Sequence, residues 1–257
     1  MSSTLAKGLR VLEALAASDS ARGISEFARE LKLDKSAVQR IFQTLAAEGY
    51  IEKDAGSSQY KPTLRLWELG SVVIGRNETR RLLHPILRYA AKTSGLTVYF
   101  AWADFPDVIY LDKVEGEKGR PNSSDPGHRI PLHVAASGRA ILAFLDQQHL
   151  PKIEKAIEKQ GEFEADYTKR LRADLKVIQQ RLYACTERGS TSRINSVAAP
   201  VWGPASVLPV GSIVLTSDSA TLPHADFERI GALAVSTGEQ ATRMLGGSYP
   251  IAINDAP

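Results

Sequence analysis

Residues 34–49 read DKSAVQRIFQTLAAEG, and this stretch decides how the 257-residue chain is organised. Its apolar residues recur at intervals of three, one and three, which places on one face of a helix the side chains of Val38, Ile41, Phe42 and Leu45. Asp34 is expected to cap the start of this helix, and Gly49 is expected to stop it. The pattern predicts a capped helix with one buried face.

The opposite face of this helix is polar and free of acidic residues. Ser36, Gln39, Arg40 and Gln43 fall at i, i+3, i+4 and i+7, with Lys35 at the N-terminal edge. Arginine donates two bonds to guanine, glutamine pairs with adenine, and lysine or serine holds phosphates, so each good bidentate pair discriminates between bases by roughly 1–3 kcal/mol. The face therefore suits the major groove of DNA.

Two shorter helices are predicted before it. The first ends near residues 18–20 and is expected to turn inward Leu5, Leu9, Leu12 and Ala16. The second, capped by Ser25, is expected to turn inward Phe27, Ala28 and Leu31. A turn of about three or four residues then leads to the third helix, and this arrangement is a helix-turn-helix.

A short hairpin is predicted after the third helix. Residues 50–53 and 59–61 flank the turn-forming residues 54–58, which is typical of a wing. We expect Ser25, at the start of the second helix, and Ser57, in the wing, to join the five residues of the third helix in contacting DNA. A three-helix module that binds protein is the alternative, and the order helix, helix-turn-helix, wing favours DNA.

Composition and charge agree with a soluble, intracellular protein. The chain is 43% hydrophobic and 24% charged, which excludes disordered, collagen-like and small disulfide-rich proteins. Residues 1–92 hold 15 Lys and Arg against 10 Asp and Glu, and the rest hold 17 against 19, so the basic charge lies in the N-terminal third. The single Cys185, the absence of a secretion signal and the prolines within the uncharged residues 194–217 lead us to expect a cytoplasmic protein without a membrane span.

The sequence patterns of the middle and the C-terminal part differ from those of the three helices and the hairpin. Residues 62–95 form two helical stretches divided around 76–78, which serve either as a plain connector or as a dimerising linker. Beyond them, strands at 98–102 and 108–111 are joined by a hairpin turn at 104–107. Helices are expected near 138–145, 151–159, 169–183 and 225–245, with strands near 196–201 and 210–216 and a loop at 116–127. This order predicts an α+β fold with an antiparallel sheet.

Three sequence blocks resemble the IclR family of bacterial transcriptional regulators. They are residues 5–13 with 36–51, residues 130–143 and residues 197–201, in the family's order and across nearly the whole chain. The resemblance implies a winged helix-turn-helix at 1–63, a linker helix at 64–80, and an effector-binding and oligomerisation domain at 81–250 akin to GAF and PAS domains. It also implies a homodimer, with a dimer of dimers as a further step, on a roughly palindromic operator in double-stranded DNA.

The resemblance further implies a site for a small organic effector, a carboxylate or an aromatic acid. Carried over by local motif, its lining is Gly119, Asn122, Ala136, Ser137, Thr186, Ser196, Val214 and Thr216. Ser137 is expected at a helix N-terminus, which favours an anion, and the hydroxyls of Ser196 and Thr216 are expected to add donors.

The chain departs from the family pattern near this site. Thr186 replaces a common Asp, Arg193 stands where a Gly is usual, and Arg188 lies in a segment that is usually more acidic. These changes suit a more negatively charged or bulkier ligand. Whether Arg188, Arg193 or Cys185 touches the ligand stays open, as do the effector's identity, the operator and the choice between repression and activation.

Motifs for other functions are absent from the sequence. It has no nucleophile elbow, phosphate-binding loop or zinc-binding helix, and His128 and His133 are five residues apart with loop residues between them. We therefore expect no enzyme activity, no cofactor and no metal. The alternative function is a small-molecule sensor that acts through protein contacts without sequence-specific DNA binding.

Overall fold

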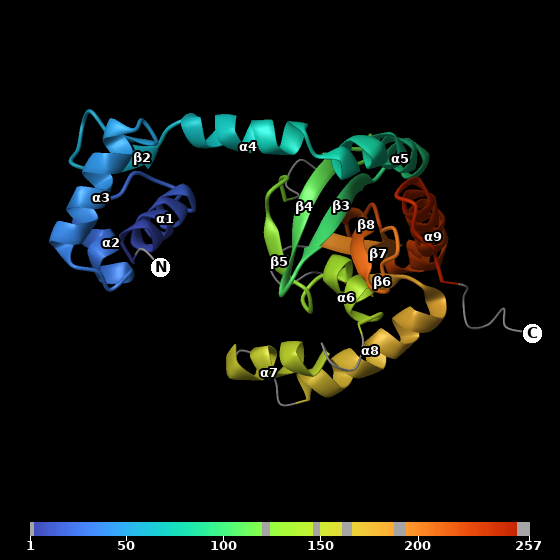
Figure 1. Ribbon diagram of the computed structural model, residues 1–257. Coiled ribbons are helices and arrows are strands. Elements are labelled where there is room, and N and C mark those ends of the chain that lie inside the picture. Colours follow the sequence, from blue (N-terminus) through green and yellow to red (C-terminus); the bar gives the residue numbers. More distant parts are fainter. Residues whose placement is uncertain (1–2, 120–123, 146–149, 161–165, 188–193, 251–257) are drawn as a thin grey trace, which may run out of the picture. The chain divides into compact units, whose positions relative to one another are not determined.

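The computed structural model describes residues 3–119, 124–145, 150–160, 166–187 and 194–250 (Figure 1). The chain divides into two compact units, Met1–Arg76 and Asn77–Pro257, which are treated one at a time below. Their division falls inside the segment 64–80 that the sequence analysis assigns to a linker. That segment holds the whole of one helix, Arg65–Gly75, and the first residues of the next, which begins at Glu78.

The first unit is a helical module with a two-stranded hairpin. Its elements are α1 (Ser3–Ala16), α2 (Ile24–Glu30), α3 (Lys35–Ala47), β1 (Ile51–Lys53), β2 (Tyr60–Pro62) and α4 (Arg65–Gly75). The hairpin strands are antiparallel. The core consists of Val11, Leu15, Phe27, Val38, Ile41, Phe42 and Ile51. This order confirms the predicted helix, helix-turn-helix and wing.

The inward face of α1 differs from the prediction. Leu5 and Leu9 are 65% and 51% exposed, whereas Val11 and Leu15 are fully buried. Ala16 is exposed as well. The helix carries two apolar stripes of similar spacing, and the one that contains Val11 packs into the common core of the first unit. Periodicity within one helix does not reveal that choice.

Two of the expected helix caps also differ. The N-cap of α2 is Gly23, whose N–H donates to Oε1 of Glu26 at 3.4 Å, and Ser25 lies exposed in the first turn. Asp34 does precede α3, but its side chain makes no capping hydrogen bond. Gly49 follows α3 with φ of +76°, as expected of a C-terminal stop, because glycine adopts this conformation without steric cost.

A six-stranded antiparallel sheet forms the centre of the second unit. Its spatial order is β5-β4-β3-β8-β7-β6. The strands are β3 (Thr97–Asp104), β4 (Asp107–Val114), β5 (Arg129–Pro131), β6 (Ala184–Thr186), β7 (Ile194–Trp202) and β8 (Pro209–Asp218). The sheet confirms the predicted α+β class. The two short edge strands, β5 and β6, were not predicted.

Helices cover both faces of this sheet (Figure 1). On one face, α5 (Glu78–Ser94) and α9 (Phe227–Met244) pack over a core that includes Val98, Phe100, Val197 and Leu215. On the other lies α6 (Ala136–Leu142), with α8 (Tyr167–Arg181) and α7 (Leu150–Gln160) beyond it. A 3₁₀ turn, His224–Asp226, leads into α9. We call the second side the α6 face of the sheet.

A bulge in β4 ties α5 to the sheet. The register shifts so that Tyr110 pairs with Ala101 while Asp112 pairs with Phe100. Because of this bulge, the side chains of Tyr110 and Asp112 point to opposite faces of the sheet. Asp112 is 2% exposed, and its carboxylate oxygens lie 3.1 Å from Nε of Arg80 and 2.7 Å from Nδ1 of His84 on α5. Both oxygens of a buried carboxylate are therefore held by one helix.

Candidate DNA-binding surface and effector site

The outer face of α3 presents the five polar side chains that the sequence predicts. Lys35, Ser36, Gln39, Arg40 and Gln43 are all exposed, and none of these side chains forms a hydrogen bond or an ion pair within the described residues. The inward face is held by the buried Val38, Ile41 and Phe42. Because the inner face is fixed in the core, the polar groups are held outward on a rigid helix, as base contacts in a groove require.

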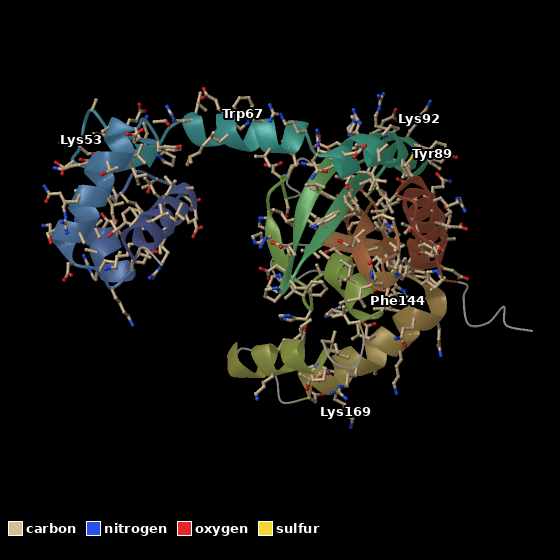
Figure 2. The ribbon with its side chains drawn as sticks, in the orientation of Figure 1. Lys53, Trp67, Tyr89, Lys92, Phe144 and Lys169 are labelled. Carbon is tan, nitrogen blue, oxygen red and sulfur yellow. The ribbon has the colours of Figure 1, made fainter. Side chains whose placement is uncertain are left out.

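The two serines expected outside α3 are in different situations. Ser25 is exposed in the first turn of α2, where its hydroxyl faces water. Ser57 donates its hydroxyl proton to Asp54 at 2.8 Å and accepts the Gln59 N–H at 3.2 Å, so it already stabilises the wing turn. Lys53, labelled in Figure 2, adds an exposed cation at the end of β1. The sequence analysis did not single it out.

Strand register brings several candidate effector residues together on the α6 face. Cross-strand pairing aligns one row of four hydroxyl side chains from four neighbouring strands, namely Thr97, Thr216, Ser196 and Thr186. Directly paired residues point to the same face of a sheet. The next row along the strands contains Tyr99, Val214, Ala198 and Ala184. A hydrogen-bonding row thus borders a mainly apolar one.

Two of the hydroxyl groups in this row already donate their protons to hydrogen bonds within the chain. Thr216 donates to the carbonyl oxygen of Asn195 at 2.8 Å, and its oxygen lies 2.9 Å from that of Ser196. Since a hydroxyl has one proton, Ser196 donates to Thr216. In this arrangement neither Ser196 nor Thr216 has a proton left for a ligand, although both were expected to be donors. Ser196 keeps an oxygen lone pair.

Thr97 completes the same row, but its hydroxyl is unpaired. The residue is 1% exposed, and Oγ1 makes no hydrogen bond within the described residues. A Cβ at Gly119 would lie 2.3 Å from this oxygen, so the glycine backbone packs directly over it. Gly119 therefore lies at the hydroxyl row, whereas Asn122 is outside the described residues.

Ala136 and Ser137 open α6, above a more distant row of the sheet. Ser212 of β8 donates to the Ser137 carbonyl at 2.9 Å. Gly138 permits the close approach of α6 to the preceding segment, because a Cβ there would lie 2.1 Å from the Leu132 carbonyl oxygen. Ser212 is four residues from Thr216 along β8, a separation of about 13 Å. The candidates therefore span one face and do not converge on one point.

The Ser137 hydroxyl is fully buried. It forms no hydrogen bond of ordinary geometry among the described residues, although it lies beside the Tyr110 side chain. Burial raises the pKa of Tyr110 to about 12, and the Ser137 hydroxyl opposes that rise. Tyr110 thus stays protonated at neutral pH. Its ring stacks on that of Tyr99, with ring centroids 4.5 Å apart.

Sequence reasoning missed Thr97, Tyr99 and Tyr110 on this face. The sequence did signal the two strands and the hairpin between them, and alternation would have placed Thr97 and Tyr99 on one face. It does not reveal that β8 lies beside β3, and the bulge breaks the alternation along β4. The missing information is long-range pairing.

Cys185 is turned away from the effector candidates. It pairs with Val197, whose side chain belongs to the α5 and α9 side of the sheet. Burial is the main cause that raises the pKa of the Cys185 thiol to about 11, so the thiol is protonated at neutral pH. Arg188 and Arg193 lie outside the described residues.

The two histidines considered as ligands lie in unlike environments. His128 is exposed and His133 is buried. The pKa of His133 is lowered, first by burial and second by the nearby positive charge of Arg139. No group of three or more His, Cys, Asp or Glu side chains in the described ranges is arranged to hold a metal ion. Within the same ranges, no helix has both the length and the apolar character needed to cross a membrane.

Comparison with known proteins accounts for both units. Residues 4–55 match the model of the IclR helix-turn-helix domain, and residues 72–242 match that of the bacterial transcriptional regulator IclR C-terminal domain. A probable transcriptional regulator from Cupriavidus necator, SauR, is 27% identical over 197 residues, which cover 76% of this chain and 78% of that protein.

Solved structures share the fold. An IclR family transcriptional regulator from Brucella abortus is 26% identical, with a TM-score of 0.82 over 95% of this chain and 92% of that one. An IclR homologue from Microbacterium hydrocarbonoxydans, solved in complex with 4-hydroxybenzoate, is 18% identical, with a TM-score of 0.70 over 94% and 99% of the two chains. With both family models matched in order, this chain belongs to the IclR family of DNA-binding transcriptional regulators.

Proposed function

We propose that this regulator reads a roughly palindromic operator as a homodimer and changes its affinity for that operator when a small organic acid binds the α6 face. The observation that carries the DNA-reading part is the outer face of α3, where Gln39 and Arg40 are exposed and free of partners within the described residues. Lys35 and the start of α3 are suited to phosphates, and Gln39 and Arg40 are suited to base edges.

The exposed apolar surface of the first unit supports a dimer. No residue of α4 is buried within the chain, although the helix carries Trp67 and Val73, which are 70% and 72% exposed. Figure 2 labels Trp67 on this helix. A groove of about 560 Å³ between α1 and α3 is lined in part by Leu5, Leu9 and Leu12. Exposed apolar surface of this kind marks an interaction site, and a symmetric dimer would place two α3 helices on two half-sites.

Sedimentation of a paired variant tests this dimer. Trp67→Glu combined with Val73→Glu places two charges on the proposed interface and should give a monomer. The affinity of this monomer for the operator should be about 10²-fold lower, because the second DNA-binding head is lost. Val207→Glu, at an 88% exposed position in the second unit, is the control and should leave the assembly unchanged. The same runs distinguish a dimer from a dimer of dimers. A double variant that sediments like the wild type would contradict the proposal.

Two buried hydroxyls support an effector site on the α6 face. Thr97 and Ser137 both have oxygens that are shielded from water and lack a hydrogen bond within the described residues. A buried polar group without a partner costs roughly 1–3 kcal/mol, so a ligand that supplies an acceptor to either hydroxyl would recover part of that cost. The structure bound to 4-hydroxybenzoate lends support through the shared fold, and we propose that the effector here is likewise a small carboxylate or aromatic acid.

The β4 bulge suggests how effector binding would be transmitted to the DNA-binding head, which is the winged helix-turn-helix of the first unit. Tyr110 faces the α6 side, whereas Asp112, two residues later, holds Arg80 and His84 on α5. The helix α5 directly follows the segment that leads from the head. We propose that ligand binding shifts β4 and thereby α5, which changes the placement of the two heads on their half-sites. Coupling of this kind is reciprocal.

The first experiment is fluorescence anisotropy of a labelled fragment from just upstream of the protein's own gene, beside a scrambled fragment of equal length, over a salt series. A specific regulator should prefer the former by about 10³-fold at physiological salt. Small carboxylates and aromatic acids, including 4-hydroxybenzoate, are then screened for a change in operator affinity. Equal affinities for both fragments that vanish together with salt would favour a sensor that acts through protein contacts.

A further inference from the structure

Arg22 lies in the turn between α1 and α2, yet its backbone pairs with strand β2 of the wing. Its N–H donates to the Tyr60 carbonyl at 3.0 Å, and the Tyr60 N–H donates to the Arg22 carbonyl at 2.9 Å. This reciprocal pair is the pattern of antiparallel strands, so the turn adds a third, one-residue strand beside β2. The start of the helix-turn-helix and the wing are thereby held together through one residue.

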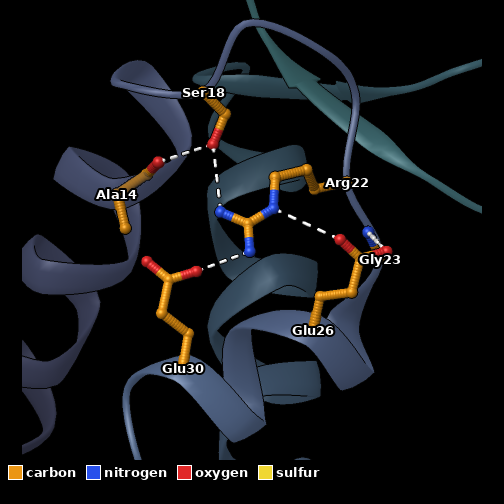
Figure 3. Close-up of polar contacts among 6 residues, drawn as sticks. All are labelled: Ala14, Ser18, Arg22, Gly23, Glu26 and Glu30. Carbon is orange, nitrogen blue, oxygen red and sulfur yellow. Dashed lines mark hydrogen bonds and ion pairs between the residues drawn. The ribbon is translucent and has the colours of Figure 1, made fainter.

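The Arg22 side chain joins the two helices on either side of this turn (Figure 3). Its Nη1 donates to Ser18 Oγ at 3.3 Å, and Ser18 donates to the Ala14 carbonyl at the end of α1. Its Nε and Nη2 contact Glu26 at 3.2 Å and Glu30 at 2.5 Å, both on α2. Three nitrogens thus reach three acceptors in different directions, which a planar guanidinium does and an ammonium on a flexible stem does not.

Aromatic rings extend the contacts of Arg22, which we call the Arg22 joint, to α3. The Arg22 guanidinium carbon lies 4.4 Å from the centroid of the buried Phe27 ring. Phe27 packs against Phe42 of α3 with centroids 5.5 Å apart, and Tyr60 meets the edge of Phe42 at 4.9 Å. Through its backbone, its side chain and the rings beneath it, Arg22 connects α1, α2, α3 and the wing.

The contacts of Arg22 also fix where the negative charge of α2 lies. Glu26 and Glu30 are 44% and 46% exposed, and Arg22 draws both carboxylates toward the turn. Hydrogen bonding to Glu30 is the first cause that raises the pKa of Arg22, so the guanidinium stays charged at any pH relevant to DNA binding. In helix-turn-helix proteins the helix before the recognition helix crosses the phosphate backbone.

We infer that Arg22 is a positioning residue for DNA binding: it holds α2 and the wing in a fixed relation to α3, so that their phosphate contacts are made together with the contacts of α3. It acts through geometry and not through its net charge. Arg22 need not touch DNA itself. Loosening this joint should leave α3 folded but should uncouple the wing and α2 from it.

Arg29 provides a matched control because it lies exposed on α2, the helix that Arg22 contacts, and its side chain forms no hydrogen bond or ion pair within the described residues. Arg22→Gln and Arg29→Gln remove the same charge, and Arg22→Lys keeps it. The full-length variants are titrated with random-sequence duplex DNA over a salt series, so that no operator needs to be known. Amide hydrogen exchange at Tyr60 and at Phe42 reports on the joint and on the core of α3.

Arg22→Gln and Arg22→Lys should both weaken duplex binding by about tenfold relative to Arg29→Gln, with a smaller salt slope, because phosphate contacts are lost. The Tyr60 amide should exchange faster, and the Phe42 amide should stay protected. Wild-type affinity in Arg22→Lys, or equal affinity in the two glutamine variants, would overturn the inference, since charge alone would then explain the effect.

A triple variant keeps the inference falsifiable if Arg22→Gln unfolds the head. Replacing Glu26 and Glu30 with Gln alongside Arg22→Gln removes the unpaired carboxylates and gives a net charge one unit more positive than in the wild type. If geometry matters, this variant should bind duplex DNA about tenfold more weakly than the wild type, although its more positive charge favours binding to phosphates. Affinity equal to or above that of the wild type would contradict a positioning role.

Discussion

On α3, Gln39 and Arg40 are exposed to water, whereas on the α6 face of the second unit Thr97 of β3 and Ser137 of α6 are shielded from it. Both sets lack hydrogen-bond partners within the described residues, but only the second set pays for it, because an exposed group keeps its water and a buried one does not. The proposed DNA-binding surface therefore costs little stability, whereas the unpaired hydroxyls of the proposed effector site lower the stability of the ligand-free protein. The two regions should respond differently to mutation.

The largest effect is expected on the exposed face. Gln39→Ala with Arg40→Ala should lower the preference for operator over scrambled DNA by about 10²-fold or more, because two bidentate base contacts are lost. The melting temperature should hardly change, since both side chains are exposed. Anisotropy on the two fragments measures the preference. Lys35→Ala is the contrasting variant and should weaken binding to both fragments alike.

A second prediction concerns reactivity in the second unit. With a pKa of about 11, the Cys185 thiol should be alkylated by iodoacetamide at pH 8 about 10²-fold more slowly than free cysteine, because the thiolate is the nucleophile. Mass spectrometry follows the reaction, and the chain unfolded in urea is the control that should react at the ordinary rate. Rapid alkylation of the folded chain would show that burial does not protect this strand.

The sharpest comparison within the second unit is between two threonines directly opposite each other in the sheet. Thr97→Val should raise the melting temperature of the ligand-free protein by about 3 °C, since an unpaired buried hydroxyl is removed. Thr216→Val should lower it by a similar amount, because the bond to the Asn195 carbonyl is lost. Scanning calorimetry measures both. A fall in both variants would mean that the Thr97 hydroxyl is satisfied in the native protein.

The smallest effect is a pH dependence from His133. Its folded pKa lies below the unfolded value of 6.5, so the unfolded chain binds more protons and stability falls as the pH drops through and below 6.5. The wild type should therefore lose more thermal stability between pH 7.5 and 5.5 than His133→Gln does. Equal losses in the two proteins would rule out His133 as a source of acid sensitivity.

The head was the more predictable of the two units because its signals are local. Spacing within the 13 residues of α3 located both the buried face and the exposed polar face, and Gly49 marked the end of the helix. Errors arose where a second element decides the outcome. Val11 and Leu15, not Leu5 and Leu9, pack into the core shared with the other elements, and Gly23 with Glu26 caps α2 in place of Ser25.

The candidate effector site was less predictable because its layout depends on pairing between distant strands. The resemblance supplied Ser196 and Thr216, but neither it nor the strand pattern pointed to Thr97, which joins them only because β3 pairs with β8. The acceptors to which the Ser196 and Thr216 hydroxyls donate depend in turn on atomic positions. Alternation within one strand carries no information on either point.

Selection of binding sites from a pool of random duplexes tests the central claim most directly. Wild-type protein is mixed with the pool, bound DNA is sequenced, and the Gln39→Ala, Arg40→Ala variant is run beside it. We predict that the wild type enriches two half-sites related by a two-fold axis and that the variant enriches none. No enrichment by the wild type, or the same enriched sequence with both proteins, would contradict a regulator that reads its operator through the outer face of α3.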